Sequence, residues 1–207
     1  WGMLVLVAGV SGSRSPDRVS AEEDDPSFGQ GAELGWLALV GLLVVGFFNG
    51  WLYGLEEVGH TGMIALDGFR LFSNWIFLGA AAFAILISFS YVHRQRLQAG
   101  EFYALILLST AGMMFMGGSR DLMVIFLGLE VMSIGVYALT AFNRRDRKSS
   151  EAGLKYFLLG AFSTGFFLYG IALVYGATGS TNVALIGASV ADGTASAGLL
   201  TAGVALL

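Results

Sequence analysis

Long apolar runs constrain this chain more than any other feature of its sequence. Five stretches of about 17 to 25 residues carry few charged side chains, and a helix needs about 20 apolar residues to cross a bilayer. The 207 residues are 56% hydrophobic and only 13% charged, with 30 glycines, as is typical of a protein with several membrane spans. The sequence therefore predicts an all-α fold, a polytopic transmembrane helix bundle.

We expect residues 1–207 to form one membrane domain, a fragment with about five complete helices and a truncated helix at each end. The fragment interpretation rests on an apolar start without Met and on a stop inside another apolar run. The spans are expected at Trp1–Val10, Leu34–Leu55, Leu71–Val92, Glu101–Gly117, Asp121–Phe142, Ala152–Gly176 and Ala195–Leu207.

Three connections between these runs have distinct compositions. Residues 11–33 contain both prolines and four consecutive acidic residues, and they are expected to form an acidic, solvated loop. Residues 118–120 are short enough for a tight hairpin between antiparallel helices. Residues 177–194 are rich in Gly, Ser, Thr and Asn, and we interpret them as a connection.

The distribution of Lys and Arg predicts the orientation. One side collects eight basic residues in three connections, and the other side collects only Arg70 and Arg120. Loops with more Lys and Arg stay in the cytoplasm, so the side with eight is expected to be cytoplasmic. The sequence thus predicts a multi-pass membrane protein, in contact with lipid and without a nucleic-acid partner.

Several kinds of site are excluded or disfavoured by the sequence. The chain has no cysteine, which excludes disulfides, iron–sulfur ligation and thiolate zinc sites within it. His60 and His93 fall in or beside loops, so they are poor haem ligands and are interpreted as interface residues. No nucleotide-binding motif, metal-ligand spacing or catalytic triad is present.

Glu130 is the strongest candidate site residue. It lies inside the apolar run 121–142, where a charge costs roughly 2.5–3.5 kcal/mol on insertion scales. Ser133 and Tyr137 follow at i+3 and i+7, which puts all three residues on one face of a helix. A proton-carrying carboxylate is one interpretation of this polar stripe. A structural carboxyl that bonds to a neighbouring helix is the other.

Lys155 is a second candidate, a few residues into the run 152–176. It can act in proton transfer, extend its amine back to the headgroups, or pair with Glu151 four residues earlier. A direct salt bridge with Glu130 is not expected because the two residues differ in depth. A bridging water between them is the nearer alternative.

Ordered blocks in several spans resemble a known family. They include Phe102–Met114, Ser119–Ser133 and Glu151–Ser180. Together they resemble subunit N of the bacterial proton-pumping NADH:quinone oxidoreductase, respiratory complex I, most densely between residues 67 and 180.

The resemblance implies an antiporter-like fold, of which this chain would be the N-terminal portion of the first helical repeat. It implies proton transfer by Glu130 and Lys155, which match functional positions of the family, with Ser133, Tyr137 and Glu151 in support. It also implies a non-redox subunit of an enzyme, a translocase, in the bacterial inner (plasma) membrane. No metal or cofactor is then expected in this chain, and NADH, FMN, iron–sulfur clusters and quinone belong to partner subunits.

Within this resemblance the electron donor is NADH, ferredoxin or coenzyme F420. The family's further lysines are expected beyond Leu207, so that residues 1–207 alone would not pump. A subunit of a multi-subunit cation/proton antiporter shares the helical plan and is the alternative function. A non-transporting scaffold, in which Glu130 only orients helices, is a third.

Overall fold

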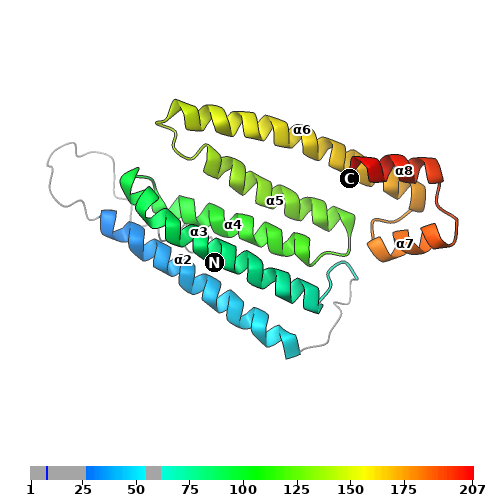
Figure 1. Cartoon of the computed structure of the whole chain (residues 1–207), viewed down its shortest axis with the longest axis horizontal. Coiled ribbons are helices and arrows are strands. Elements are labelled where there is room, and N and C mark those ends of the chain that lie inside the picture. The colour runs from blue at the N-terminus through cyan, green and yellow to red at the C-terminus, as the bar shows by residue number, and fades with distance from the viewer. Residues whose placement is uncertain (1–7, 9–26, 55–61) are drawn as a thin grey trace.

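The computed structural model describes residues 8, 27–54 and 62–207, which form helices joined by short connections (Figure 1). Five of the described helices, α2 to α6, are long and apolar enough to cross a membrane, so the predicted all-α transmembrane bundle is confirmed. The elements are α2 (Ser27–Trp51), the 3₁₀ turn η1 (Leu52–Gly54), α3 (Gly68–Arg94), α4 (Ala99–Gly117), α5 (Leu122–Thr140), α6 (Arg147–Thr178), α7 (Val183–Ala191) and α8 (Ala197–Leu206).

Capping side chains set the starts of the three spans α3, α5 and α6. The carboxylate of Asp67 accepts from the Arg70 backbone N–H at 2.9 Å, and Asp121 and Asp146 do the same two residues ahead of themselves. Each cap satisfies a backbone donor that the first turn of a helix leaves free. Because Asp146 is such a cap, α6 begins five residues before the expected Ala152.

The predicted loop 11–33 is too long at its C-terminal end. Helix α2 begins at Ser27, so residues 27–33 belong to the helix rather than to the loop. The preceding Pro26 is compatible with this start, because proline fits the entry to a helix but not its interior. Residues 11–26 and the truncated span expected at Trp1–Val10, apart from Ala8, lie outside the described residues.

The connection predicted at residues 177–194 contains a helix. Helix α6 ends at Thr178 and is capped by Gly179, whose φ of 73° is the left-handed conformation that glycine adopts most easily. Helix α7 then starts because the Asn182 side chain accepts from the backbone N–H groups of Ala184 and Leu185, at 3.0 and 3.4 Å. The polar composition of the connection hid this short apolar helix.

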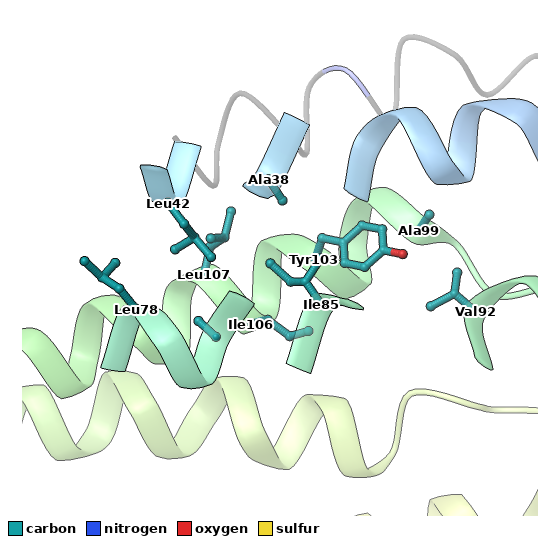
Figure 2. Close-up of a cluster of buried hydrophobic side chains, with 10 residues drawn as sticks. Ala38, Leu42, Leu78, Ile85, Val92, Ala99, Tyr103, Ile106 and Leu107 are labelled. Atoms are coloured by element: carbon teal, nitrogen blue, oxygen red, sulfur yellow. The ribbon is translucent and has the colours of Figure 1, made fainter. Parts of the chain in front are cut away.

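The hydrophobic core lies where α2, α3 and α4 meet, and Figure 2 shows their side chains pointing toward one another. Tyr103 of α4 and Ile85 of α3 are almost completely buried at its centre. The cluster comprises Ala38, Leu42, Leu78, Ala81, Ile85, Val92, Ala99, Tyr103, Ile106 and Leu107. Helix α5 adds only the partly buried Leu139 at the edge of this cluster. Helix α5 packs on α4, α6 on α5, and α8 on α6.

The connections at one end of the bundle are bonded to one another. The backbone N–H of Ala65 donates to Gly118, and the N–H of Leu122 donates to Thr181, both at 2.9 Å. The Thr181 hydroxyl also donates to the buried carboxylate of Asp121 at 2.6 Å. These bonds fix where α5 begins relative to α3 and to the end of α6. They lie at the end opposite the basic connections that follow α3 and α5 (Figure 1).

Candidate functional site

Glu130 lies near the middle of the 19-residue helix α5. Eight residues separate it from the start of the helix, which is about 12 Å along the axis. Its Oε1 atom is shielded from solvent and has no hydrogen-bond partner within the described part of the chain. A buried oxygen without a donor is unfavourable by about 1–3 kcal/mol, so Glu130 opposes the stability of the bundle.

One face of α5 packs closely against α4 through glycines. A Cβ on Gly112 of α4 would lie 2.7 Å from the Gly128 carbonyl oxygen, and a Cβ on Gly128 would lie 2.9 Å from the Gly112 carbonyl oxygen. Both distances are too short for a side chain, so the two backbones touch directly. One turn further on, the hydroxyl of Ser109 donates to the Met132 carbonyl oxygen at 3.2 Å. This face, which includes Gly135, leaves no room for further groups.

The opposite face of α5 carries the polar stripe and faces α6. The rings of Phe126 and Phe167 stack with centroids 6.3 Å apart, and the rings of Tyr137 and Tyr156 meet edge to face at 4.9 Å. Glu130 falls on the helix face that Phe126 and Tyr137 share, because side chains three or four residues apart lie one above the other. The predicted stripe therefore lies at the α5–α6 contact.

The contact with α6 determines the surroundings of Tyr137 and Ser133. The hydroxyl of Tyr137 lies on Gly160 of α6, in a position that a Cβ at residue 160 would occupy. Ser133 is buried, with 8% of its surface exposed, yet no hydrogen bond of its hydroxyl occurs within the described residues. The α5–α6 contact thus holds a carboxylate and two hydroxyls with few protein partners.

The ring contacts also fix the register of the two antiparallel helices. Glu130 follows Phe126 by four residues, so it lies at the level of Ser163 and Thr164, about four residues before Phe167. The Thr164 hydroxyl is engaged with the Ala161 carbonyl oxygen at 3.3 Å. Gly165, where a Cβ would meet no atom within 4 Å, is turned away from α5 and does not line this level.

Lys155 does not reach Glu130 in this structure. It lies about eight residues before the level of Glu130 on α6, roughly 12 Å along the axis. It also lies on the side of α6 away from Gly160, since the helix turns about 100° per residue. Its amine pairs with Glu151 in the i, i+4 arrangement, and the two side chains are 70% and 57% exposed. One water cannot bridge such a separation, so the expected Lys155–water–Glu130 link is wrong here.

Sequence reasoning missed a buried polar pair between α2 and α3. The Asn74 amide donates to the Asn49 side-chain oxygen at 2.9 Å, and the Asn49 amide donates to the Leu71 carbonyl oxygen at 3.0 Å. Both asparagines are 3% exposed, and the Asn74 oxygen has no partner among the described residues. The signal available in the sequence was one asparagine inside each of two apolar runs, Asn49 in residues 34–55 and Asn74 in residues 71–92.

The histidines and acids of the described residues do not gather into a metal-ligand cluster. No group of three or more His, Cys, Asp or Glu side chains that could hold a metal occurs among them. His93 is exposed in the last turn of α3, at the basic end, whereas His60 lies outside the described residues. Asp67 and Arg70 form the start of α3, with Arg70 also donating to the Ala65 carbonyl oxygen at 3.0 Å.

Comparison with known proteins gives three concordant results. Residues 119–207 match the family model described as "NADH:quinone oxidoreductase/Mrp antiporter, TM". This segment begins just before α5 and includes Glu130 and Lys155.

Curated relatives match more of the chain. NADH-quinone oxidoreductase subunit N of Trichlorobacter lovleyi is 50% identical over 177 residues, which is 84% of this chain and 36% of the relative. Subunit N 2 of Roseiflexus castenholzii is 40% identical over 194 residues, which is 94% of this chain and 36% of the relative. The chain thus spans a little over a third of the length of these relatives.

Solved structures share the fold. A chain of respiratory complex I from Thermus thermophilus with bound aureothin aligns with a TM-score of 0.69 and 26% identity, over 100% of this chain and 42% of that one. A chain of the archaeal membrane-bound sulfane sulfur reductase aligns with a TM-score of 0.77, over 99% of this chain and 40% of that one. At 23% identity the second match concerns the fold alone.

The five spanning helices and the bacterial relatives indicate a multi-pass integral protein of the plasma membrane. Sequence identity, family model and helical fold agree, and the chain belongs to the family of NADH-quinone oxidoreductase subunit N, with its antiporter-like transmembrane domain.

Proposed function

We propose that this chain is part of a proton-translocating membrane subunit and that Glu130 is a proton-carrying carboxylate in it. The observation that carries the proposal is the shielded, unpartnered Oε1 of Glu130 at mid-depth in a spanning helix. Leaving such an oxygen without a donor opposes folding, so its presence needs a benefit. Binding and releasing a proton is the chemistry that a lone carboxyl at this depth can perform.

The subunit acts without a redox centre of its own. Quinone reduction occurs in partner subunits, which hold the flavin, the iron–sulfur clusters and the quinone, and this chain moves protons in response. The named relatives support this role, since they are subunits of an NADH-quinone oxidoreductase. The membrane partners are the neighbouring subunits of that assembly and the lipid.

The charge on Glu130 is coupled to the charge of a lysine on a neighbouring helix. A carboxylate is stabilised in a membrane interior when a cation approaches, and it takes up a proton when the cation leaves. Lys155 takes part in a second proton-transfer step. Its amine pairs with Glu151 on the side of α6 that faces away from α5. Breaking that exposed pair frees the lysine for another carboxylate at little energetic cost.

The test is the substitution Glu130→Gln in the full-length protein within the assembled complex. Proton uptake by sealed vesicles is measured and divided by the rate of electron-donor oxidation. We expect the ratio to fall by roughly a hundredfold or more, the lower end of the range for losing a proton-transfer group. Glu101→Gln is the matched control, because Glu101 is an exposed acid in the first turn of α4. A normal ratio in an assembled Glu130→Gln complex would refute the proposal.

Cation/proton exchange is the second candidate, favoured by the family description that also covers Mrp antiporters. Such a protein exchanges sodium for protons without an electron donor. Genes for flavin and iron–sulfur subunits beside this gene favour the redox-driven pump, and their absence favours the antiporter.

A further inference from the structure

The α6-facing side of α5 holds more polar chemistry than Glu130 alone. Ser133 and Tyr137 follow Glu130 on the same face, toward the end of α5 that leads into the basic connection. Neither hydroxyl has a hydrogen bond within the described residues. A hydroxyl in a membrane interior normally satisfies itself on the carbonyl four residues earlier, as Thr140 and Thr110 do at 2.9 and 2.8 Å. Two neighbouring hydroxyls that do not are free to bond to something else.

Contacts with α6 fix the position of the Tyr137 hydroxyl. Its ring is held edge to face against Tyr156 and Phe157, with centroids 4.9 and 5.9 Å away. Its oxygen lies against Gly160, where any larger residue would displace it. Since Gly160 is further along α6 than both rings, the hydroxyl points toward the level of Glu130. The slot at Gly160 therefore directs a donor-acceptor group into the membrane interior.

The spacing of the three groups fits a chain with intervening water. The backbone positions of Ser133 and Glu130 are about 4.5 Å apart along the axis, and the Tyr137 hydroxyl, at Gly160, lies near the level of Ser133. No direct hydrogen bond joins these three groups within the described residues, so the connection between them needs water. A water that bridges two polar groups bonds nearly as well as a direct contact.

We propose that protons reach Glu130 from the basic end of the bundle along the α5–α6 contact, through the hydroxyls of Tyr137 and Ser133 and the waters between them. This inference rests on the proposed function and names the route to its carboxylate. Each hydroxyl oxygen accepts one proton as it gives up its own, so every step conserves charge and needs no oxidant or reductant. Tyr137 and Ser133 are relay residues, and Gly160 is a positioning residue.

The route bypasses Lys155. Tyr156 and Phe157 place Tyr137 on the α5 side of α6, whereas Lys155 and Glu151 lie on the exposed side. Proton delivery to Glu130 and the movement of charge on Lys155 are therefore separate steps on two sides of one helix. Removing Lys155 should leave the delivery step intact.

The test is Tyr137→Phe in the full-length protein within the assembled complex, since phenylalanine keeps the ring contacts and removes only the hydroxyl. Tyr169→Phe, an exposed tyrosine on the same helix as Gly160, is the matched control. We expect Tyr137→Phe to lower proton uptake per donor oxidised by roughly tenfold. The ratio of rates in H₂O and D₂O should rise in this variant and not in the Tyr169→Phe control, because a purely structural loss would not make proton transfer the slow step.

Two further variants keep the outcome decisive. Ser133→Ala removes a small hydroxyl without touching any ring and should show the same two changes, so it replaces Tyr137→Phe should that protein fail to assemble. Gly160→Ala fills the slot and should mimic Tyr137→Phe. Rates and isotope ratios in Tyr137→Phe and Ser133→Ala equal to those of Tyr169→Phe would overturn the relay. If Glu130→Gln is impaired in the same assay, normal behaviour of the two hydroxyl variants contradicts the relay alone. Normal transport by Glu130→Gln would instead contradict the proposed function.

Discussion

The two faces of α5 pack against their neighbouring helices through different kinds of contact. Toward α4 the backbones touch at Gly112 and Gly128, with Cβ clearances below 3 Å. Toward α6 the contact along the middle of α5 is made by aromatic rings at 4.9 to 6.3 Å, with Glu130 and two hydroxyls between them, and a close glycine contact, Gly153 against Ala141, lies at the end of α5. Small residues let membrane helices approach without help from the hydrophobic effect. The packing against α4 therefore fixes the position of α5, and the face toward α6 is available for proton transfer.

A large side chain on the α4 side should have the largest effect. Gly128→Leu forces atoms into the backbone of α4, and overpacking of this kind costs about 3 kcal/mol or more. We expect little or no assembled complex, as measured by size-exclusion chromatography of detergent extracts. Gly165→Leu is the control, because a Cβ there meets nothing within 4 Å. Equal yields for the two variants would mean that the α4 side is not the tighter one.

Glu130→Leu should separate assembly from transport. An apolar side chain in place of an unpartnered carboxyl is neutral or stabilising for folding, so the complex should assemble normally. Proton uptake should be lost to the same extent as in Glu130→Gln. The scaffold hypothesis predicts that both properties survive, and the antiporter hypothesis predicts that sodium-dependent proton exchange is lost instead.

A pair of serine substitutions compares the two sides at constant chemistry. Ser109 and Ser133 are 6% and 8% exposed, but only Ser109 has a hydrogen bond, to the Met132 carbonyl oxygen. Ser109→Ala should lower the stability of the protein by about 1 kcal/mol, the usual net value of such a bond. Ser133→Ala should change stability by less, about half of that at most. Thermal unfolding in detergent measures both, and the reverse order would contradict the bonding described here.

The smallest effect is expected for the exposed ion pair on the far side of α6. Lys155→Met removes a pair whose members are 70% and 57% exposed. Exposed i, i+4 pairs contribute about 0.3–0.5 kcal/mol, so the unfolding temperature should hardly change. Transport should nevertheless fall when the lysine is a second proton-transfer step. A large loss of stability would instead show that Lys155 is buried against another part of the assembly.

Much of the fold follows from the sequence because lipid imposes a simple rule on it. Apolar runs of about 20 residues became α2 to α6, and the hairpin at 118–120 joins α4 and α5 as expected. Helix starts were less predictable, since a cap such as Asp146 extends α6 by a turn beyond its apolar run. Helix α7 was missed because its apolar residues are few and its neighbours are polar.

The candidate site was predictable along one helix and not between helices. The spacing of Glu130, Ser133 and Tyr137 defines a single face whatever the surroundings. Which neighbour that face meets depends on packing at glycines, and so does the side of α6 that bears Lys155. Nothing in the apolar pattern distinguishes Gly160, which seats a hydroxyl, from Gly165, which faces open space.

The central claim is that Glu130 changes its protonation state during turnover, and infrared difference spectroscopy of the working complex tests this most directly. A protonated carboxyl has a C=O stretching band that a carboxylate lacks, and this band shifts in D₂O. The account predicts a carboxyl band that appears or disappears when electron transfer starts and is missing in Glu130→Gln. An identical difference spectrum in that variant would show that this carboxyl keeps one protonation state, which contradicts the account.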